Sequence, residues 1–257
     1  MDNQAYINAF VELHSVLSRQ GPGDEAFTVN LLHELRTDLP SSPAIIDLGC
    51  GTGAASFLLA EHLKGKVQAV DASEAFIDSL SQQVASCGLS DVIHPSVDNF
   101  SALAEVDYPT DHYDLLWSEC SAYHLGFRKA LKTWRPLVKK GGIAIISELS
   151  WLTSTPSTEA QAFWQAAYPL MATESDNIEM AKRYGFELIF AKRLPEKAWW
   201  DNYYNPLLKR MQQLRMNIGM NASEALYDVL DNTDAEIALF DRHSSEYGYT
   251  FYILKAV

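Results

Sequence analysis

The stretch "AIIDLGCGTGAAS" (residues 44–56) joins an apolar run to an acidic residue and three closely spaced glycines. Gly49, Gly51 and Gly53 fall just after Asp47. Glycine permits the positive φ of a tight turn and removes the Cβ atom, so a ligand can approach the backbone. A helix that starts at such a turn also presents unpaired N–H groups. The stretch therefore predicts a nucleotide-like ligand at the end of a buried strand.

Short apolar runs separated by helical stretches continue beyond this motif. The expected strands are 44–48, 67–71, 91–95, 113–118 and 142–149, and the expected helices between them are 54–64, 74–87 and 125–139. This alternation predicts a parallel sheet with helices on both faces. Apolar runs at 185–194 and 248–257 supply two more strands.

The length of 257 residues, 47% of them hydrophobic, suits one core with an appended cap. Apolar residues at helical spacing predict a helix over residues 5–18, which "QGPG" (20–23) ends, and Asp24 is placed to cap a second helix that ends near Pro40. We expect a single domain over 1–257. Its parts are an N-terminal helical cap (1–40), a cofactor-binding core (41–150), helical insertions (151–184 and 196–246) and C-terminal strands (185–195 and 247–257).

The chain is acidic, with a formal charge of −13. An acidic surface repels nucleic-acid phosphates and anionic lipids, so we expect neither as a partner. The N-terminal residues show no basic leader followed by an apolar run, and no apolar run has the length of a membrane span. The three cysteines form no C-x-x-C pair, which is typical of a reducing cytoplasm. No histidine spacing indicates a metal site.

Two ligands fit the glycine turn. "GCGTGA" matches the dinucleotide pattern G-x-G-x-x-A, with Asp71 about 20 residues on to receive ribose hydroxyls. A pyrophosphate is anionic, however, and would be repelled by Asp47. S-adenosylmethionine carries an ammonium and a sulfonium, so Asp47 favours it, whereas Asp71 suits either ligand.

Four motifs in order resemble the class I, Rossmann-like S-adenosylmethionine-dependent methyltransferases. They are "IIDLGCGTG" (45–53), "VQAVDAS" (67–73), "YDLLWSE" (113–119) and "LVKKGGIAIISE" (137–148). The resemblance covers about residues 40–150 most strongly. "RQGPG" (19–23) and "ELSWLTSTPSTEAQAFWQAAYP" (148–169) are similar to a bacterial small-molecule branch related to the quinone-biosynthesis methyltransferases.

The resemblance implies a Rossmann-like α/β fold: a seven-stranded, mostly parallel sheet with an antiparallel last strand, helices on both faces and a helical cap. It implies methyl transfer from S-adenosylmethionine to a small-molecule acceptor, with S-adenosylhomocysteine as product, by a monomer or homodimer. The alternatives are a NAD(P)-dependent oxidoreductase and a protein that binds S-adenosylmethionine without catalysis.

The resemblance also assigns cofactor-binding residues. It places Asp47, Gly49, Gly51 and Gly53 around the methionine part, with Cys50 beside them, Asp71 on both ribose hydroxyls, Ala72 against the adenine, and Ser118 near the site. The family often has Gly-Asp-Ala after the third strand, where this chain has Pro95-Ser96-Val97-Asp98. Either Ser96, with the Val97 N–H, or Asp98 receives the adenine amino group. Asp98 is also a suitable helix cap.

In-line displacement at a sulfonium releases a neutral group, so positioning and exclusion of water supply much of the catalysis. A general base is needed only where the nucleophile carries a proton. "WSECSAYHLGF" (117–127) follows the fourth strand and offers Glu119, Tyr123 and His124. Glu119 is the best placed of the three. His124 suits a base or a solvated position, and Tyr123 suits the site or simple packing.

The segment "RQGPG" is a candidate cover for the cofactor. Arg19, Gln20 and the Gly21 N–H can donate to the cofactor carboxylate, although an ordinary interhelical loop is the alternative. We expect His14 to face solvent rather than close the site. The aromatic residues of the second insertion form either a box for a flat or cationic substrate or contacts with the core; they are Trp199, Trp200, Tyr203 and Tyr204.

Overall fold

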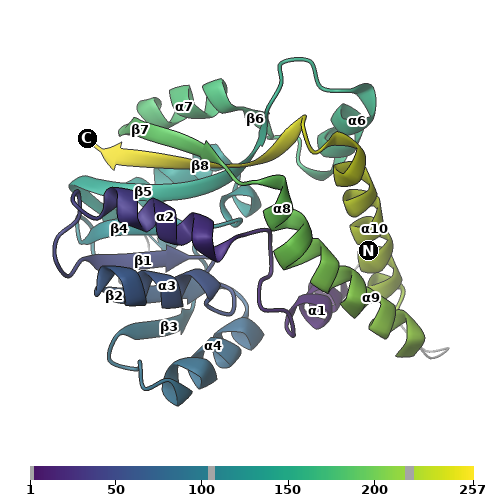
Figure 1. Ribbon diagram of the computed structural model, residues 1–257, viewed down its shortest axis with the longest axis horizontal. Coiled ribbons are helices and arrows are strands. Elements are labelled where there is room, and N and C mark those ends of the chain that lie inside the picture. Colours follow the sequence, from purple (N-terminus) through teal and green to yellow (C-terminus); the bar gives the residue numbers. More distant parts are fainter. Residues whose placement is uncertain (1–2, 104–107, 218–222) are drawn as a thin grey trace.

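The fold is centred on one twisted sheet, shown in Figure 1. The structure is a computed structural model that describes residues 3–103, 108–217 and 223–257. The strands are β1 (Ala44–Leu48), β2 (Lys66–Asp71), β3 (Ile93–Val97), β4 (Tyr113–Ser118), β5 (Val138–Trp151), β6 (Ala172–Thr173), β7 (Phe186–Arg193) and β8 (Tyr247–Ala256). Seven of them run in the order β3-β2-β1-β4-β5-β8-β7, and β6 adds an eighth beside β5.

The sheet confirms the predicted topology, with one addition. Strands β1 to β6 pair in parallel, whereas β8 is antiparallel to both β5 and β7. The addition is the two-residue β6, which lies inside an insertion that we expected to be helical. Strand order changes direction between β1 and β4, so a crevice opens at their carboxyl ends.

Helices cover both faces of the sheet. They are α1 (Asn3–His14), α2 (Glu25–Leu35), α3 (Ala54–Leu63), α4 (Glu74–Ser86), α5 (Phe127–Trp134), α6 (Thr158–Ala167), α7 (Glu174–Arg183), α8 (Glu196–Trp199), α9 (Asn205–Asn217) and α10 (Glu224–His243). Side chains alternate across a strand, so Ile45 packs with the cluster that includes α2 and α3, and Ile46 packs with the cluster that includes α5.

Several element boundaries differ from the prediction: α1 ends at His14 rather than at residue 18, and β3 spans Ile93–Val97 rather than 91–95. The helix expected over 125–139 ends at Trp134, because Pro136 lacks an N–H and the chain continues as a short 3₁₀ turn. Strand β5 then starts at Val138, earlier than expected, where it pairs with Tyr113 of β4, and it extends to Trp151 because residues 143–151 pair with β8. Pro95 lies in β3, an edge strand, where a missing N–H is tolerated.

The helical cap consists of α1 and the insertion 196–246. Helix α8 continues through a π-helical turn, Trp200–Tyr204, into α9, and α1 contacts both α9 and α10. Trp199 stacks on Phe240 at 4.3 Å and on Tyr249 at 5.2 Å between ring centroids. The packing interpretation of the aromatic residues is therefore confirmed for Trp199, which also reaches the cavity described below.

Our expectation that His14 faces solvent is wrong. Its side chain is 2% exposed, because the insertion covers α1, and Nε2 lies 3.1 Å from the Tyr203 hydroxyl. A helical periodicity alone did not indicate that a second helix would cover the polar side of α1.

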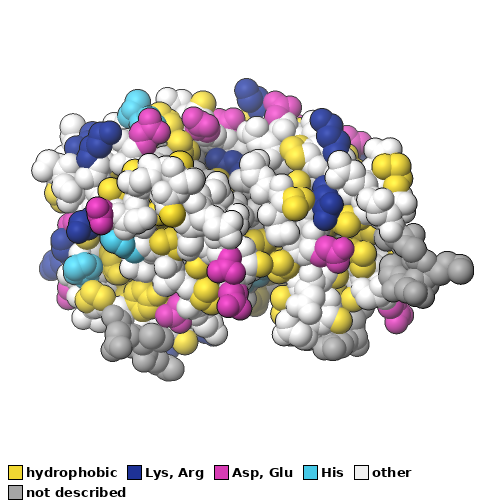
Figure 2. Space-filling model, turned by 90° about the horizontal axis from the view of Figure 1, so that it is seen from below, with side chains coloured by type: hydrophobic (Ala, Val, Ile, Leu, Met, Phe, Trp, Pro, Cys, Tyr) yellow, Lys and Arg dark blue, Asp and Glu magenta, His cyan; other side chains and the backbone are white. Residues whose placement is uncertain are grey.

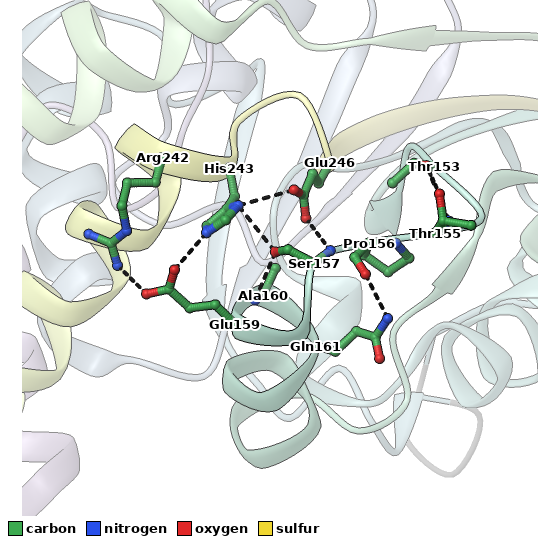
Figure 3. A network of polar contacts seen from close by, with 10 residues as sticks. All are labelled: Thr153, Thr155, Pro156, Ser157, Glu159, Ala160, Gln161, Arg242, His243 and Glu246. Carbon is green, nitrogen blue, oxygen red and sulfur yellow. Dashed lines mark hydrogen bonds and ion pairs between the residues drawn. The ribbon is translucent and has the colours of Figure 1, made fainter.

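A polar network fastens the first insertion to the end of α10, as Figure 3 shows. Arg242 Nη2 donates to Glu159 Oε1 at 2.6 Å, and His243 Nε2 lies 2.8 Å from Glu159 Oε2. The Ser157 N–H donates to Glu246 Oε2 at 2.8 Å. These contacts join the two insertions just beyond the ends of strands β5 and β8. No helix within the described residues is both long enough and apolar enough to cross a membrane.

Candidate active site

The glycine motif forms the turn between β1 and α3. Gly49 and Cys50 both donate their N–H groups to Val70 O, at 2.8 and 3.1 Å, which anchors the turn to the end of β2. Gly51 has a φ of +54°, and a Cβ atom there would collide with Gln20 Oε1. Gly53 instead lies against Leu80, so it permits close packing of α4 rather than access for a ligand.

Asp71 joins the end of β2 to this turn. Its Oδ2 accepts from the Gly51 N–H and its Oδ1 from the Ser73 N–H, both at 2.9 Å. Burial raises the pKa of the Asp71 carboxyl, and the backbone N–H groups of Ser73, Gly51 and Ala72 oppose that rise. The carboxylate therefore shapes the turn as well as facing the crevice.

Asp47 is buried at the foot of the same crevice, with 1% of its surface exposed. The Ser56 hydroxyl donates to Asp47 Oδ2 at 2.6 Å. Burial raises the pKa of Asp47 to about 7; the Ser56 hydrogen bond opposes this shift, and the negative charges of Glu119 and Asp71 add to it. A cation bound beside Asp47 would favour its ionised form.

The segment 19–23 packs over the glycine turn. Gln20 Oε1 accepts from the Thr52 N–H at 3.0 Å, and Gln20 Nε2 donates to Leu17 O at 3.0 Å. Arg19 Nη1 lies 2.9 Å from Glu119 Oε1 in an ion pair whose side chains are 13% and 9% exposed. Sequence reasoning proposed Arg19 and Glu119 separately, for the cofactor and the acceptor. The structure brings the two together.

The chain after β4 is held in a strained turn. Cys120 has a φ of +54°, unusual for a residue other than glycine. The turn is fixed because the Cys120 N–H donates to Ser147 Oγ at 2.7 Å and the Cys120 thiol donates to Pro22 O at 3.2 Å. The Ser121 hydroxyl donates its single hydrogen to Leu48 O at 2.7 Å. It therefore accepts from the hydroxyl of Ser118, which lies behind the turn.

A cavity of about 1520 Å³ lies between these turns and the cap. Figure 2 shows the molecule hollowed between two lobes, with acidic side chains beside the hollow. The predicted residues that line the cavity are Arg19, Gln20, Gly21, Asp47, Gly49, Cys50, Gly51, Asp71, Ala72, Glu119, Tyr123 and His124. Five predicted residues are not part of its lining, and they are Gly53, Ser96, Val97, Asp98 and Ser118.

The part of the cavity wall formed by residues that follow β3 therefore differs from the one that we predicted. Ser96 Oγ lies 3.0 Å from Gln68 Nε2 and 3.1 Å from the Tyr108 hydroxyl, away from the cavity. Asp98 Oδ1 accepts from the Asn99 N–H at 2.8 Å. The cavity is lined instead by the residues that come next, Asn99, Phe100 and Ser101. The departure from Gly-Asp-Ala shifts this wall along the chain.

The three candidate catalytic residues lie together but differ in surroundings. Burial raises the pKa of Glu119, and the charge of Arg19 opposes the rise. The Tyr123 and His124 rings lie 4.1 Å apart between centroids. His124 is exposed at the rim of the cavity, whereas Tyr123 is partly buried and its pKa is raised by burial.

Sequence reasoning missed the polar groups at the far end of the cavity. Glu236 of α10 lines it beside Tyr203 and Tyr249, and Tyr168 donates to the buried Glu148 at 2.7 Å. Burial raises the pKa of Glu148 to about 8. One signal was available: Glu236 falls on the apolar face of its helix, four residues before the buried Phe240.

Comparisons with known proteins agree with this geometry. Residues 45–142 match the family model described as a methyltransferase domain. A phosphoethanolamine N-methyltransferase from Arabidopsis thaliana is 26% identical over 159 residues, which are 61% of this chain and 31% of the relative. A dimethylglycine N-methyltransferase from Parasynechococcus marenigrum is 30% identical over 122 residues, 47% of this chain and 42% of that protein. The matches thus span less than half of either relative's length.

Among solved structures, a methyltransferase from Geobacter sulfurreducens in complex with S-adenosylhomocysteine is similar along nearly the whole chain. It superposes with a TM-score of 0.78 at 17% identity and covers 97% of this chain and 98% of its own. This likeness extends through the helical cap and establishes the fold. Residues 45–142 therefore form a methyltransferase domain, and the chain has the class I, Rossmann-like fold of S-adenosylmethionine-dependent methyltransferases.

Proposed function

We propose that the protein transfers the methyl group of S-adenosylmethionine to a small-molecule acceptor by in-line displacement. The observation that carries the proposal is a pair of carboxylates, the buried Asp47 and the partly buried Asp71, on either side of a glycine turn that faces the cavity. A cationic nucleoside matches this arrangement better than a dinucleotide does, because a pyrophosphate would meet two negative charges.

The residues present fit the cofactor. Asp71 receives the ribose hydroxyls, because each carboxylate oxygen has more than one lone pair and keeps acceptor capacity beside its backbone bond. Ala72 and the wall at Asn99–Ser101 enclose the adenine. Asp47 lies on the side of the cofactor ammonium. Arg19 lines the cavity and has N–H donors beyond the one that it gives to Glu119, and these could hold the cofactor carboxylate.

The cofactor supplies an electrophilic methyl group on a sulfonium, and this chain supplies position and shelter. Segment 19–23 packs over the turn and residues of the cap line the cavity from the other side, so a cofactor bound there would be shielded from water on two sides. Glu119 lies between the cover and the acceptor end. Its raised pKa suits it to accept a proton where the acceptor nucleophile carries one.

Binding of S-adenosylhomocysteine, followed by calorimetry, tests the proposal. We expect it to bind and to raise the unfolding temperature, whereas NAD does neither. The Asp71→Ala variant should lose at least tenfold in affinity, since hydrogen bonds to a charged group are worth about 1.5–3 kcal/mol each. The exposed Asp91→Ala is the matched control. Stabilisation by NAD alone would indicate an oxidoreductase. Binding without turnover of any acceptor would indicate a non-catalytic protein.

The finer assignments rest on composition and resemblance. The acidic charge supports the absence of nucleic-acid partners, and the three cysteines without a C-x-x-C pair support a cytoplasmic protein; a monomer or homodimer stays a prediction. Kinship with the quinone-biosynthesis branch stays a prediction. The names of the two curated relatives, which act on phosphoethanolamine and dimethylglycine, favour a small amine as the acceptor.

A further inference from the structure

Glu236 is a carboxylate at the centre of an aromatic wall. Its Oε1 accepts from the Tyr204 hydroxyl at 2.8 Å. Burial raises the pKa of Tyr123, Tyr203 and Tyr249, and the Glu236 charge raises it further in each case. These three tyrosines come from separate segments and line the same cavity as Glu236.

No described lysine, arginine or histidine forms an ion pair with Glu236. Because a carboxylate drawn out of water without a cationic partner is costly, burial raises the pKa of Glu236, and the Tyr204 hydrogen bond opposes that rise; a cation bound beside it would favour its ionised form. Glu236 nevertheless lines the cavity, which is the one direction from which a ligand can reach it. A cationic ligand would supply the missing charge.

The hydroxyl of Tyr203 is oriented by the buried His14. His14 Nδ1 lies 2.9 Å from Phe10 O, and a carbonyl only accepts, so Nδ1 carries the hydrogen. Burial lowers the pKa of His14 to about 4, which leaves the ring neutral and Nε2 as an acceptor. The Tyr203 hydroxyl, 3.1 Å away, therefore donates to Nε2. Its oxygen offers only lone pairs to a ligand.

The charges around the cavity favour the same kind of ligand. The carboxylates that line it are Glu12, Asp47, Asp71, Glu74, Glu119 and Glu236, against the cations Arg19 and Lys129. Arg19 is already paired with Glu119. An anionic acceptor, such as a phosphate ester, would meet a surplus of negative charge.

Aromatic rings complete the wall around Glu236. Trp199 and Tyr249, stacked on each other, both line the cavity with Tyr203 and Tyr123. The faces of such rings attract organic ammonium groups, with tryptophan the strongest. Rings and a carboxylate together distinguish a cation from a neutral molecule of the same shape.

We propose that the acceptor is a small organic cation whose ammonium group is held by Glu236 and the rings of Tyr203 and Tyr249, with Trp199 stacked behind Tyr249. This inference rests on the proposed methyl transfer. The nucleophilic atom of the acceptor, separate from the anchored cation, forms a bond to the methyl carbon while the carbon–sulfur bond breaks. That electron pair stays on sulfur, and any proton on the nucleophile leaves to Glu119 or to water.

Binding to protein saturated with S-adenosylhomocysteine tests the inference, with choline and tetramethylammonium as cationic probes. The neutral probe is 3,3-dimethylbutan-1-ol, which has the shape of choline without its charge. By calorimetry, we expect at least one cation to bind at millimolar or lower concentration, and the alcohol to bind at least tenfold more weakly than choline. Glu236→Gln should abolish this preference while S-adenosylhomocysteine affinity stays the same.

Two controls separate the causes of a negative result. Glu236→Gln keeps an acceptor for the Tyr204 hydroxyl and removes a buried carboxyl whose pKa is raised, so its unfolding temperature should be no lower than that of the wild type, and Glu224→Gln changes an exposed carboxylate of the same helix. Failure of both cations to bind, or equal binding of choline and the alcohol, overturns the cationic acceptor alone. Failure of S-adenosylhomocysteine to bind overturns the proposed function instead.

Discussion

Replacement of Asp47 by asparagine should stabilise the protein and weaken its binding of the cofactor. The carboxyl is buried at the foot of the crevice, and its pKa is about 7 instead of the ordinary 3.8. The folded protein therefore binds a proton at Asp47 over a pH range in which the unfolded chain has lost it. Asp47→Asn keeps an oxygen to accept from Ser56 but never ionises.

The sign and size of the effect follow from the pKa. Because the folded pKa is raised, Asp47 favours folding below about pH 4, and this contribution is lost as the pH rises through 7. A shift of about 3 pKa units corresponds to about 4 kcal/mol, since one unit is about 1.4 kcal/mol. At pH 8 the Asp47→Asn variant should be more stable than the wild type by up to about that amount. At pH 4 the two should be nearly equal.

Urea unfolding at intervals from pH 4 to pH 9, without ligand, measures the difference in the free energy of unfolding. Calorimetry with S-adenosylhomocysteine over the same range measures affinity. The wild type should bind more tightly as the pH rises through 7, because ionised Asp47 attracts the cofactor ammonium. Asp47→Asn should show at least tenfold weaker binding at pH 8 and no such rise. Asp91→Asn, an exposed aspartate, is the control.

Parallel stability curves for the wild type and Asp47→Asn would show that the folded protein does not retain the Asp47 proton, and the reasoning from burial would be refuted. Equal affinity of both proteins at pH 8 would remove Asp47 from the cofactor site. The two measurements are independent, because unfolding is followed without ligand.

Gly51→Ala should reduce S-adenosylhomocysteine affinity at least tenfold by calorimetry, since the added Cβ displaces the Gln20 side chain. The control is Gly88→Ala, where the glycine also has a positive φ (+67°) but has open space around it, so this variant should bind normally. Equal losses of affinity in the two variants would contradict the steric argument. Amide hydrogen exchange over residues 15–30 should slow when S-adenosylhomocysteine binds, and unchanged rates would refute a role of this segment as cover. A hydrogen bond to Glu159 is the main cause that raises the pKa of His243, so its contribution to stability is present below about pH 6.5 and lost as the pH rises through its folded pKa. His243→Gln should remove this contribution from the pH dependence of the unfolding temperature, measured between pH 5 and 9. An unchanged pH profile would show that His243 does not contribute to stability in this way.

The central strands and their parallel direction could be predicted because the signal is local. Each buried strand is a short apolar run, and each crossover is long enough for a helix. The end of the helix at Trp134 and the length of β5 were not predicted correctly. The helix ends at Trp134 because Pro136 interrupts it, a signal that the predicted helix over 125–139 ignores. The length of β5 depends on its pairing with β8, which is distant in sequence.

The cofactor end of the site was accessible from the sequence for the same reason. Asp71 and the glycine turn follow adjacent strands, so their meeting is a consequence of the sheet order. Ser96 was assigned by analogy with the family pattern, but it lies within β3, where alternation directs it to Gln68. For Glu236 the local pattern indicates only that a carboxylate falls on the apolar face of its helix; that it lines the cavity depends on how α10 packs against the rest of the cap.

The concentration of carboxylates links these observations. Asp47, Asp71 and Glu119 each have a raised pKa that comes chiefly from burial, and Arg19 is the cation that balances one of them. Such a site is unfavourable for the free protein, but it becomes favourable around a cationic cofactor, because the ligand then supplies the missing positive charge. The same reasoning applies at the other end of the cavity, where Glu236 faces aromatic rings without a cationic partner among the described residues. The same electrostatic argument, that buried carboxylates favour a cationic ligand, therefore supports both the proposed cofactor at one end of the cavity and the proposed cationic acceptor at the other.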